Sequence, residues 1–290
     1  MKLALSITMG LGLLLTGCLG SEDIIARTAV GKVGHDQKHD LPDGAPDSEC
    51  SPQASRVMVI TKSGRLFALQ PETGEVENLG IPSCLSYQGF SLAIDHNGAI
   101  WVQPNKGNMQ VIDPVTLKCT ERDIKVEMAA MAFVYDPATE KELLYGMELD
   151  TLSVIDPKTL KETRLAKLDR TQPIIRSFTG TRDGQLLAVT DGPAPHTYRI
   201  RRVDLATGTF QTVWPSVDLG DGDDYFMGGA IWRDDFILGF SNADNLGPSG
   251  FLRFSTETEQ TSPLATYEIE EGDGQSMLIA SSTCASAPQN

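Results

Sequence analysis

Short runs of alternating apolar and polar residues occupy the chain from Arg56 onward. Gly, Asp, Asn and Pro separate these runs, a pattern that is typical of β-strands joined by tight turns. One turn is written almost identically twice, as VIDPVTLK from Val111 and as VIDPKTLK from Val154. In both copies a Pro stands at the second turn position, where its fixed φ suits a type I turn. The pattern predicts an all-β domain that is built from repeats.

Related turns recur along the domain and give its repeat length. They begin at Gln70, Asp113, Asp156, Asp204 and Ser255, which are 43, 43, 48 and 51 residues apart. Repeats of about 40–50 residues with four strands each are typical of β-propeller blades. We therefore expect a single five-bladed β-propeller, with six blades as the alternative if residues 50–76 hold further strand pairing.

The expected strands can be assigned blade by blade. The second blade takes residues 91–95, 100–103, 109–113 and 119–124, the third 131–136, 143–147, 152–156 and 163–168, the fourth 175–180, 185–190, 198–204 and 210–214, and the fifth 226–232, 236–240, 251–255 and 263–268. The first blade, with 57–61, 66–70 and 76–79, lacks an inner strand. The apolar segment 276–285 can fill that place, and such a closure would remove the exposed sheet edge.

The N-terminus reads as a targeting signal, which is not part of the fold. Lys2 precedes an apolar stretch of 13 residues, 3–15, which is short for a membrane span. The sequence LTGC that ends at Cys18 resembles the lipobox of bacterial lipoproteins. In those proteins the signal is removed before the Cys, whose thiol and new amine are then acylated. The alternative is an ordinary secretory signal. Leu19 stands directly after the Cys and, by resemblance to Gram-negative sorting rules, favours the outer membrane.

Composition divides the rest of the chain and limits its partners. We expect a signal peptide at 1–17, a lipidated Cys with a flexible acidic linker at 18–49, and the propeller at 50–290. The linker lacks apolar periodicity, so it cannot bury enough surface to offset its ordering entropy. His35 and His39 lie in it, without the helix that a metal pair at this spacing needs. With 24 basic and 39 acidic residues, the formal charge of −15 argues against nucleic-acid binding.

Four cysteines remain once Cys18 is assigned to lipidation, and they suit an oxidising compartment. In the propeller arrangement Cys50 enters the second strand of the first blade and Cys284 leaves the inner strand beside it, so we expect these two to form a disulfide. Cys84 and Cys119 then pair by elimination, although they could lie at opposite faces. Zinc is the alternative, but the domain has no CxxC or HxxxH pair.

A resemblance extends over nearly the whole chain. The lipobox, the acidic linker, the Cys-Ser opening, MVITKSGRLFALQPETG, FSLAIDHNGAIWV and the closing SSTC resemble a largely uncharacterised family of Gram-negative bacterial β-propeller lipoproteins. The resemblance implies the fold and an address in the cell envelope, with the protein facing the periplasm or exposed at the surface. It implies no activity, and it supplies no catalytic or binding residues.

Motifs for catalysis are scarce in this sequence. It has no GxSxG, no P-loop and no GxGxxG. Glycosidase propellers place carboxylates around the axis, but most acidic residues here stand in turns. Lyase-like propellers need a catalytic His, and the domain offers only His96 in a DHNG turn and His196 in a long loop. We expect no enzymatic activity and no cofactor. A hydrolase or lyase remains the third hypothesis.

Long loops supply the candidate binding residues, because binding usually resides in loops on a rigid scaffold. The acidic loop 218–226 could offer oxygens to Ca²⁺, but its spacing is not that of an EF-hand, so we expect a solvated loop and no metal. Connections of this kind share one rim of the ring. The candidate rim residues are Asp191, His196, Asp221, Asp223, Asp224, Asn242, Asp244 and Asn245. The leading hypothesis is an outer-membrane-anchored scaffold that binds a protein or envelope partner. The second is a small-ligand or glycan binder at the propeller axis.

Overall fold

The structure is a computed structural model that describes most of the predicted domain. The described residues are 50–61, 63–85, 89–104, 107–124, 127–168, 174–194, 197–218, 224–242, 249–267 and 277–286. The predicted signal peptide, Cys18 and the linker lie outside these residues. Within the described ranges, no helix is both long and apolar enough to cross a membrane.

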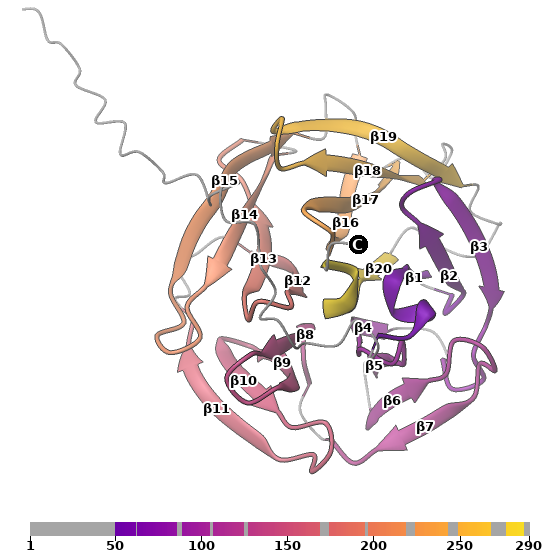
Figure 1. Ribbon diagram of the computed structural model, residues 1–290, viewed down its shortest axis with the longest axis vertical. Coiled ribbons are helices and arrows are strands. Elements are labelled where there is room, and N and C mark those ends of the chain that lie inside the picture. Colours follow the sequence, from indigo (N-terminus) through magenta and orange to yellow (C-terminus); the bar gives the residue numbers. More distant parts are fainter. Residues whose placement is uncertain are drawn as a thin grey trace, which may run out of the picture. The chain divides into compact units, whose positions relative to one another are not determined.

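Five antiparallel four-stranded sheets are arranged in a ring (Figure 1). From the inner to the outer strand, the blades are β20 (Met277–Ala280), β1 (Val57–Thr61), β2 (Leu66–Gln70) and β3 (Glu75–Gly80); β4 (Gly89–Ile94), β5 (Ile100–Pro104), β6 (Met109–Ile112) and β7 (Cys119–Arg122); β8 (Ala130–Asp136), β9 (Lys141–Glu148), β10 (Thr151–Ile155) and β11 (Glu162–Lys167); β12 (Ile175–Gly180), β13 (Leu186–Asp191), β14 (Thr197–Val203) and β15 (Phe210–Asp218); and β16 (Asp224–Trp232), β17 (Asp235–Asn242), β18 (Ser249–Ser255) and β19 (Gln260–Tyr267). This confirms the five-bladed all-β prediction over the six-bladed alternative.

The two ends of the domain close the ring in the first blade. β20 pairs antiparallel with β1, with Thr61 opposite Met277 and Met58 opposite Ala280. The predicted closing strand is therefore confirmed, but it is shorter than the expected 276–285. After β20 the chain forms the 3-10 helix η3 (Thr283–Ser286), which contacts a second one, η2 (Pro52–Ser55). Just beyond the strand, Ser282 donates its hydroxyl to the carbonyl of Ala54 in η2 at 2.6 Å.

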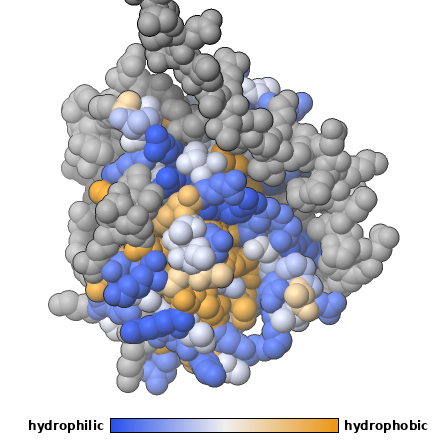
Figure 2. All heavy atoms as spheres, turned by 90° about the vertical axis from the view of Figure 1, so that its left-hand side faces the viewer, coloured by the Kyte–Doolittle hydropathy of each residue, from blue (hydrophilic) through white to orange (hydrophobic). Residues whose placement is uncertain are grey.

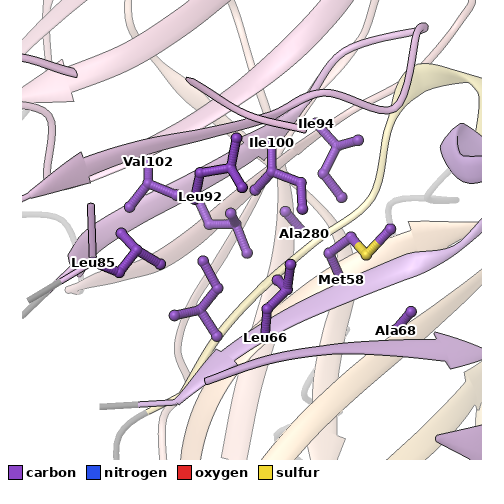
Figure 3. Packing of buried hydrophobic residues seen from close by; sticks show 11 residues of the cluster. Met58, Leu66, Ala68, Leu85, Leu92, Ile94, Ile100, Val102 and Ala280 are labelled. Carbon is purple, nitrogen blue, oxygen red and sulfur yellow. The ribbon is translucent and has the colours of Figure 1, made fainter. Parts of the chain in front are cut away.

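Apolar layers between neighbouring blades form the core. Met58 and Ile60 of β1 pack into the layer between the first two blades (Figure 3), whereas Val57 and Val59 pack on the other side against the fifth blade. Because both faces of β1, the second strand of its blade, are buried between neighbouring blades, its sequence VMVIT reads as a nearly continuous apolar run. In the outer strand β3, exposed Glu75 and Glu77 alternate with the partly buried Val76.

The repeated octapeptide is the hairpin between the third and fourth strands of a blade. In all five hairpins the fifth turn residue donates its backbone N–H to the carbonyl of the first, at 2.8–2.9 Å, and has a positive φ of 55–72°. Those fifth residues are Gly74, Leu117, Leu160, Gly208 and Glu259. Three of the hairpins begin with Asp113, Asp156 or Asp204, each of which accepts two backbone N–H groups at one carboxylate oxygen. The octapeptide recurs in the sequence because the same hairpin geometry recurs in each blade.

The outer strands run around the circumference of the ring (Figure 1). Successive strands of a sheet twist by about 20–25°, which over three steps turns the outer strand far from the direction of the inner one. The end of one outer strand consequently meets the start of the next. A Cβ added at Gly208, just before β15, would lie 2.9 Å from the carbonyl of Lys167 at the end of β11. A Cβ added at Gly74, just before β3, would likewise lie 2.6 Å from the carbonyl oxygen of Leu264 in β19.

Both predicted disulfides are confirmed. Cys50 and Cys284 are bonded with their Cα atoms 5.9 Å apart, and Cys84 and Cys119 with their Cα atoms 6.0 Å apart. The first bond joins the chain next to η2 to η3, just beyond the paired strands. The second bond links the segment after β3 to the start of β7. The concern that these last two lie at opposite faces was wrong, because the segment after β3 and the start of β7 meet between neighbouring outer strands.

Candidate functional site

The predicted binding rim is only partly described. Asp191 ends β13, and Asp224 and Asn242 stand opposite each other at the ends of β16 and β17, so these three share one face of the ring. His196, Asp221, Asp223, Asp244 and Asn245 lie outside the described residues.

The carboxylate of Asp191 is paired with an arginine of its own blade. The guanidinium of Arg176 donates to both of its carboxylate oxygens, at 2.7 and 3.1 Å. This bidentate contact raises the pKa of Arg176. Arg176 itself stands on the inner strand β12 and lines the axial cavity. The pair therefore connects the rim to the axis, and Asp191 is not an open ligand-binding carboxylate.

The axial cavity is small. Its volume is about 20 Å³, and its walls come from the five inner strands, with Leu92, Met131 and Ile279 among them. Such a volume suits one or two water molecules, whereas ligand pockets measure about 300–1,000 Å³. Its two serines are already engaged: Ser91 donates to the carbonyl of Met128 at 2.6 Å, and the hydroxyl of Ser177 accepts from the N–H of Gly229 at 3.1 Å.

A cap formed by the two chain ends closes the axis at one face; we call it the terminal cap, residues 50–56 and 281–286. It contacts the inner hairpins around it. The N–H of Ser51 donates to the carbonyl of His96 at 3.1 Å, and the N–H of Arg233 donates to the carbonyl of Ala285 at 2.5 Å. Arg182 lies against Cys50 at 3.5 Å. The Cys50–Cys284 disulfide thus holds a cover over one end of the axis, whereas the axial cavity lies toward the other end, where the inner strands begin.

Glu142 is the most heavily engaged carboxylate next to this cap. With only 5% of its side chain exposed, it accepts from the N–H and the Nδ1 of His96, at 2.9 and 2.8 Å, and from the hydroxyl of Thr283 at 2.5 Å. Nearby, burial raises the pKa of Asp95, against the hydrogen bond that it accepts from Trp101. A buried carboxylate, a His and a hydroxyl therefore meet here, but they bond to one another and lock the cap to two blades.

A groove opens beside the cap on the second blade; we call it the blade-2 groove. Its volume is about 540 Å³. The lining residues are Gln53, Asn97, Ala99, Val111, Asp113, Pro114, Val115, Thr116, Lys118 and Thr120. They come from η2, from the β4–β5 turn and from the β6–β7 hairpin. Sequence reasoning identified the hairpin as a turn, but not the groove, because η2 and the β4–β5 turn are distant in the sequence and meet only in the folded structure.

Among the described residues, no group of three His, Cys, Asp or Glu side chains is placed so that it could hold a metal ion. His96 serves as a partner of Glu142.

Comparisons with known proteins show similarity of fold and no match to a known family. No family model matches the sequence, and no curated protein matches it. Among solved structures, the chain is similar to hydrazine synthase from Kuenenia stuttgartiensis, with 14% identity over 74% of this chain and 64% of that chain and a TM-score of 0.41. It is similar to a nidogen/laminin complex, with 11% identity over 79% and 99% and a TM-score of 0.46. It is also similar to TolB from Acinetobacter baumannii, with 13% identity over 80% and 56% and a TM-score of 0.41. The chain spans less than two thirds of the hydrazine synthase and TolB chains, and these similarities concern the propeller fold alone.

Proposed function

We propose that this chain is a lipid-anchored propeller lipoprotein of the outer membrane that binds a protein or another envelope component and catalyses no reaction. The observation that carries the proposal is the narrow axis. A disulfide-bonded cap covers one end of the axis, and toward the other end the described inner strands leave a cavity of only about 20 Å³ between them. A rigid ring with a narrow centre offers its surface for binding, and large surfaces suit macromolecular partners.

Lipidation is tested by labelling cells with radioactive palmitate and separating their membranes. Replacing Cys18 by Ala should abolish the labelling and release the protein from the outer-membrane fraction, because two or three acyl chains are what makes attachment durable. Labelling that survives the Cys18→Ala change would refute the lipoprotein proposal.

Partner binding is tested by capturing the native lipidated protein from an envelope extract and identifying what accompanies it by mass spectrometry. The same protein recovered in independent captures, and absent when the Cys18→Ala variant is used as a mislocalised control, supports the proposal. Reproducible binding to glycans on an array, with no protein captured, would favour the ligand-binding alternative.

A further inference from the structure

The blade-2 groove combines a suitable size with polar side chains that make no hydrogen bond within the described part of the chain. Its volume of about 540 Å³ falls in the range of ligand-binding sites. Within the described part of the chain, the side-chain amides of Gln53 and Asn97, the ammonium of Lys118 and the hydroxyl of Thr120 make no hydrogen bond. The ammonium of Lys118 interacts electrostatically with the carboxylate of Asp113 in the same groove. These four groups line one groove, which therefore has unused capacity to donate and accept hydrogen bonds.

Backbone contacts fix the inner end of the groove. The hydroxyl of Ser51 donates to the carbonyl of Asn97 at 2.6 Å, which holds η2 on the β4–β5 turn. A Cβ at Gly98 would lie 2.7 Å from the Cβ of Gln53, so the two segments are in close contact. The amides of Gln53 and Asn97 thus stand on a rigid base that depends on the closed terminal cap.

The outer end of the groove is the repeated hairpin. Asp113 accepts the N–H groups of Val115 and Thr116 at 2.8 and 3.0 Å, and these bonds lower its pKa, so it is ionised at neutral pH. Val115 leaves 71% of its surface exposed beside this carboxylate. Lys118 and Thr120 continue the hairpin on the β7 side.

The third blade carries the same hairpin without η2. Its VIDPKTLK turn has the same backbone bonds, with Lys161 at the place of Lys118. The sequence of the hairpin is therefore explained by the shared turn geometry. The second blade differs from the third in that Gln53 of η2 lines a groove together with Asn97. The third blade offers an internal control for any role of the groove.

We propose that the blade-2 groove binds an extended polypeptide segment of a partner protein, with a carboxylate of that segment placed against Lys118. A primary amide both donates and accepts, so Gln53 and Asn97 match the alternating N–H and C=O groups of a main chain. Val111, Val115 and Pro114 offer apolar contact to one side chain. None of the ten lining residues is aromatic, so the groove lacks the stacking platform on which nucleic-acid bases are held. The inference rests on the proposed function, and it names the chemistry of the partner.

The groove is tested with the probe Ala-Ala-Ala, its C-terminal amide and a trimer of N-acetylglucosamine, titrated into the isotope-labelled full mature chain in an NMR experiment. Ala-Ala-Ala should shift the amide signals of Asn97, Thr116 and Thr120, with a dissociation constant in the millimolar range. Removing the probe's carboxylate should weaken binding about threefold, as expected for an exposed charge pair. Lys118→Glu should weaken it about tenfold because repulsion replaces attraction, whereas the matched Lys161→Glu should leave it unchanged.

Several results would overturn the inference. It fails if no signal of the groove shifts, if Lys118→Glu and Lys161→Glu have equal effects, or if the sugar trimer alone binds. A capture from envelope extract with the same two variants separates it from the proposed function. A partner retained equally by both variants leaves partner binding intact and removes the groove from it. If no partner is captured at all, the proposed function fails, and the peptide titration alone decides the groove.

Discussion

A single residue in each blade carries the strain of the repeated hairpin. The fifth turn position has a positive φ, which costs an L-residue roughly 1–2 kcal/mol and glycine little. Gly74 and Gly208 fit this position. Leu117 and Leu160 do not, but their side chains pack against the layers between blades, which offsets the cost. Glu259 has the same backbone with φ 55° and an exposed side chain, so nothing offsets its strain.

We therefore expect Glu259→Gly to stabilise the protein by about 0.5–1 kcal/mol, the relief of backbone strain less the added entropy of the unfolded chain. Urea denaturation followed by fluorescence measures the change. Leu117→Gly serves as the comparison and should destabilise, because it removes an apolar side chain from between two blades. The account of the hairpin is wrong if Glu259→Gly lowers the denaturation midpoint.

The hairpin aspartates make stability depend on pH at the acidic end. Backbone N–H groups that bond to Asp113, Asp156 and Asp204 lower the pKa of each carboxyl in the folded protein. A carboxyl whose folded pKa is lowered stabilises the fold above its unfolded pKa, near 3.9, and this stability is lost as the pH falls through the folded pKa. The melting temperature should thus drop below about pH 4.

Asn keeps the side-chain oxygen that accepts these bonds but does not titrate. Replacing Asp156 by Asn should therefore flatten part of the fall in melting temperature between pH 5 and 3, in scans by circular dichroism. Asp183→Asn, outside these hairpins, is the control. An identical pH profile for Asp156→Asn and the unchanged protein would contradict the role given to this carboxylate.

At the scale of strands, close approach between neighbouring blades limits side-chain size. A Cβ at Gly180 of β12 would overlap the carbonyl oxygen of Phe133 on β8. The carbonyl belongs to a backbone that cannot move without disturbing its sheet. Gly228 of β16 also lies on an inner strand, but a Cβ there would meet its nearest atom at 3.4 Å, an ordinary contact.

We expect Gly180→Ala to destabilise the domain by about 1–3 kcal/mol, the usual cost of overpacking, and Gly228→Ala to have a much smaller effect. Thermal melts of both variants at one protein concentration measure the difference. Equal melting temperatures for the two variants would show that the blades are less tightly packed than described.

Strands were the part of the fold that the sequence predicted well. Inner and middle strands follow from their apolar runs, and Ile175–Gly180, for example, was predicted with the bounds that it has in the structure. The hairpins follow from turn sequences such as Asp-Pro-x-Thr. The pairing of Cys84 with Cys119 followed only by elimination, because the direction of an outer strand depends on the twist accumulated across a sheet. The blade-2 groove could not be predicted, since no sequence pattern indicates that Gln53 and Asn97 line the same groove.

At the scale of the whole molecule, the ring depends on its last strand. Three outer strands carry features that discourage further pairing: β3 has Glu75 and Glu77, and a proline, which has no N–H to donate, stands within β15 (Pro215) and within β19 (Pro263). Figure 2 shows hydrophilic residues over much of one side, with hydrophobic residues gathered in its middle. The inner edge of β1 carries no charged residue or proline of this kind. It is covered only by β20, which comes from the far end of the chain.

Deleting residues 276–290 should consequently unfold or aggregate the domain. It would uncover the edge of β1, open the apolar layer around Ile279 and leave Cys50 as a free thiol. The melting temperature and the elution volume in gel filtration measure the outcome. A truncation that removes only residues 287–290, which follow η3, is the control and should behave like the full chain. A soluble protein with an unchanged melting temperature after the larger deletion would contradict the closure.

The most direct test of a ring closed by its own ends is a map of the disulfides in the native protein. Proteolysis without reduction, followed by mass spectrometry, should yield one peptide pair that joins Cys50 to Cys284 and another that joins Cys84 to Cys119. The first pair connects the beginning and the end of the domain, which meet only if the fifth blade returns to the first. Recovery of Cys50 linked to Cys84 or Cys119 would contradict the closure and the assignment of the blades.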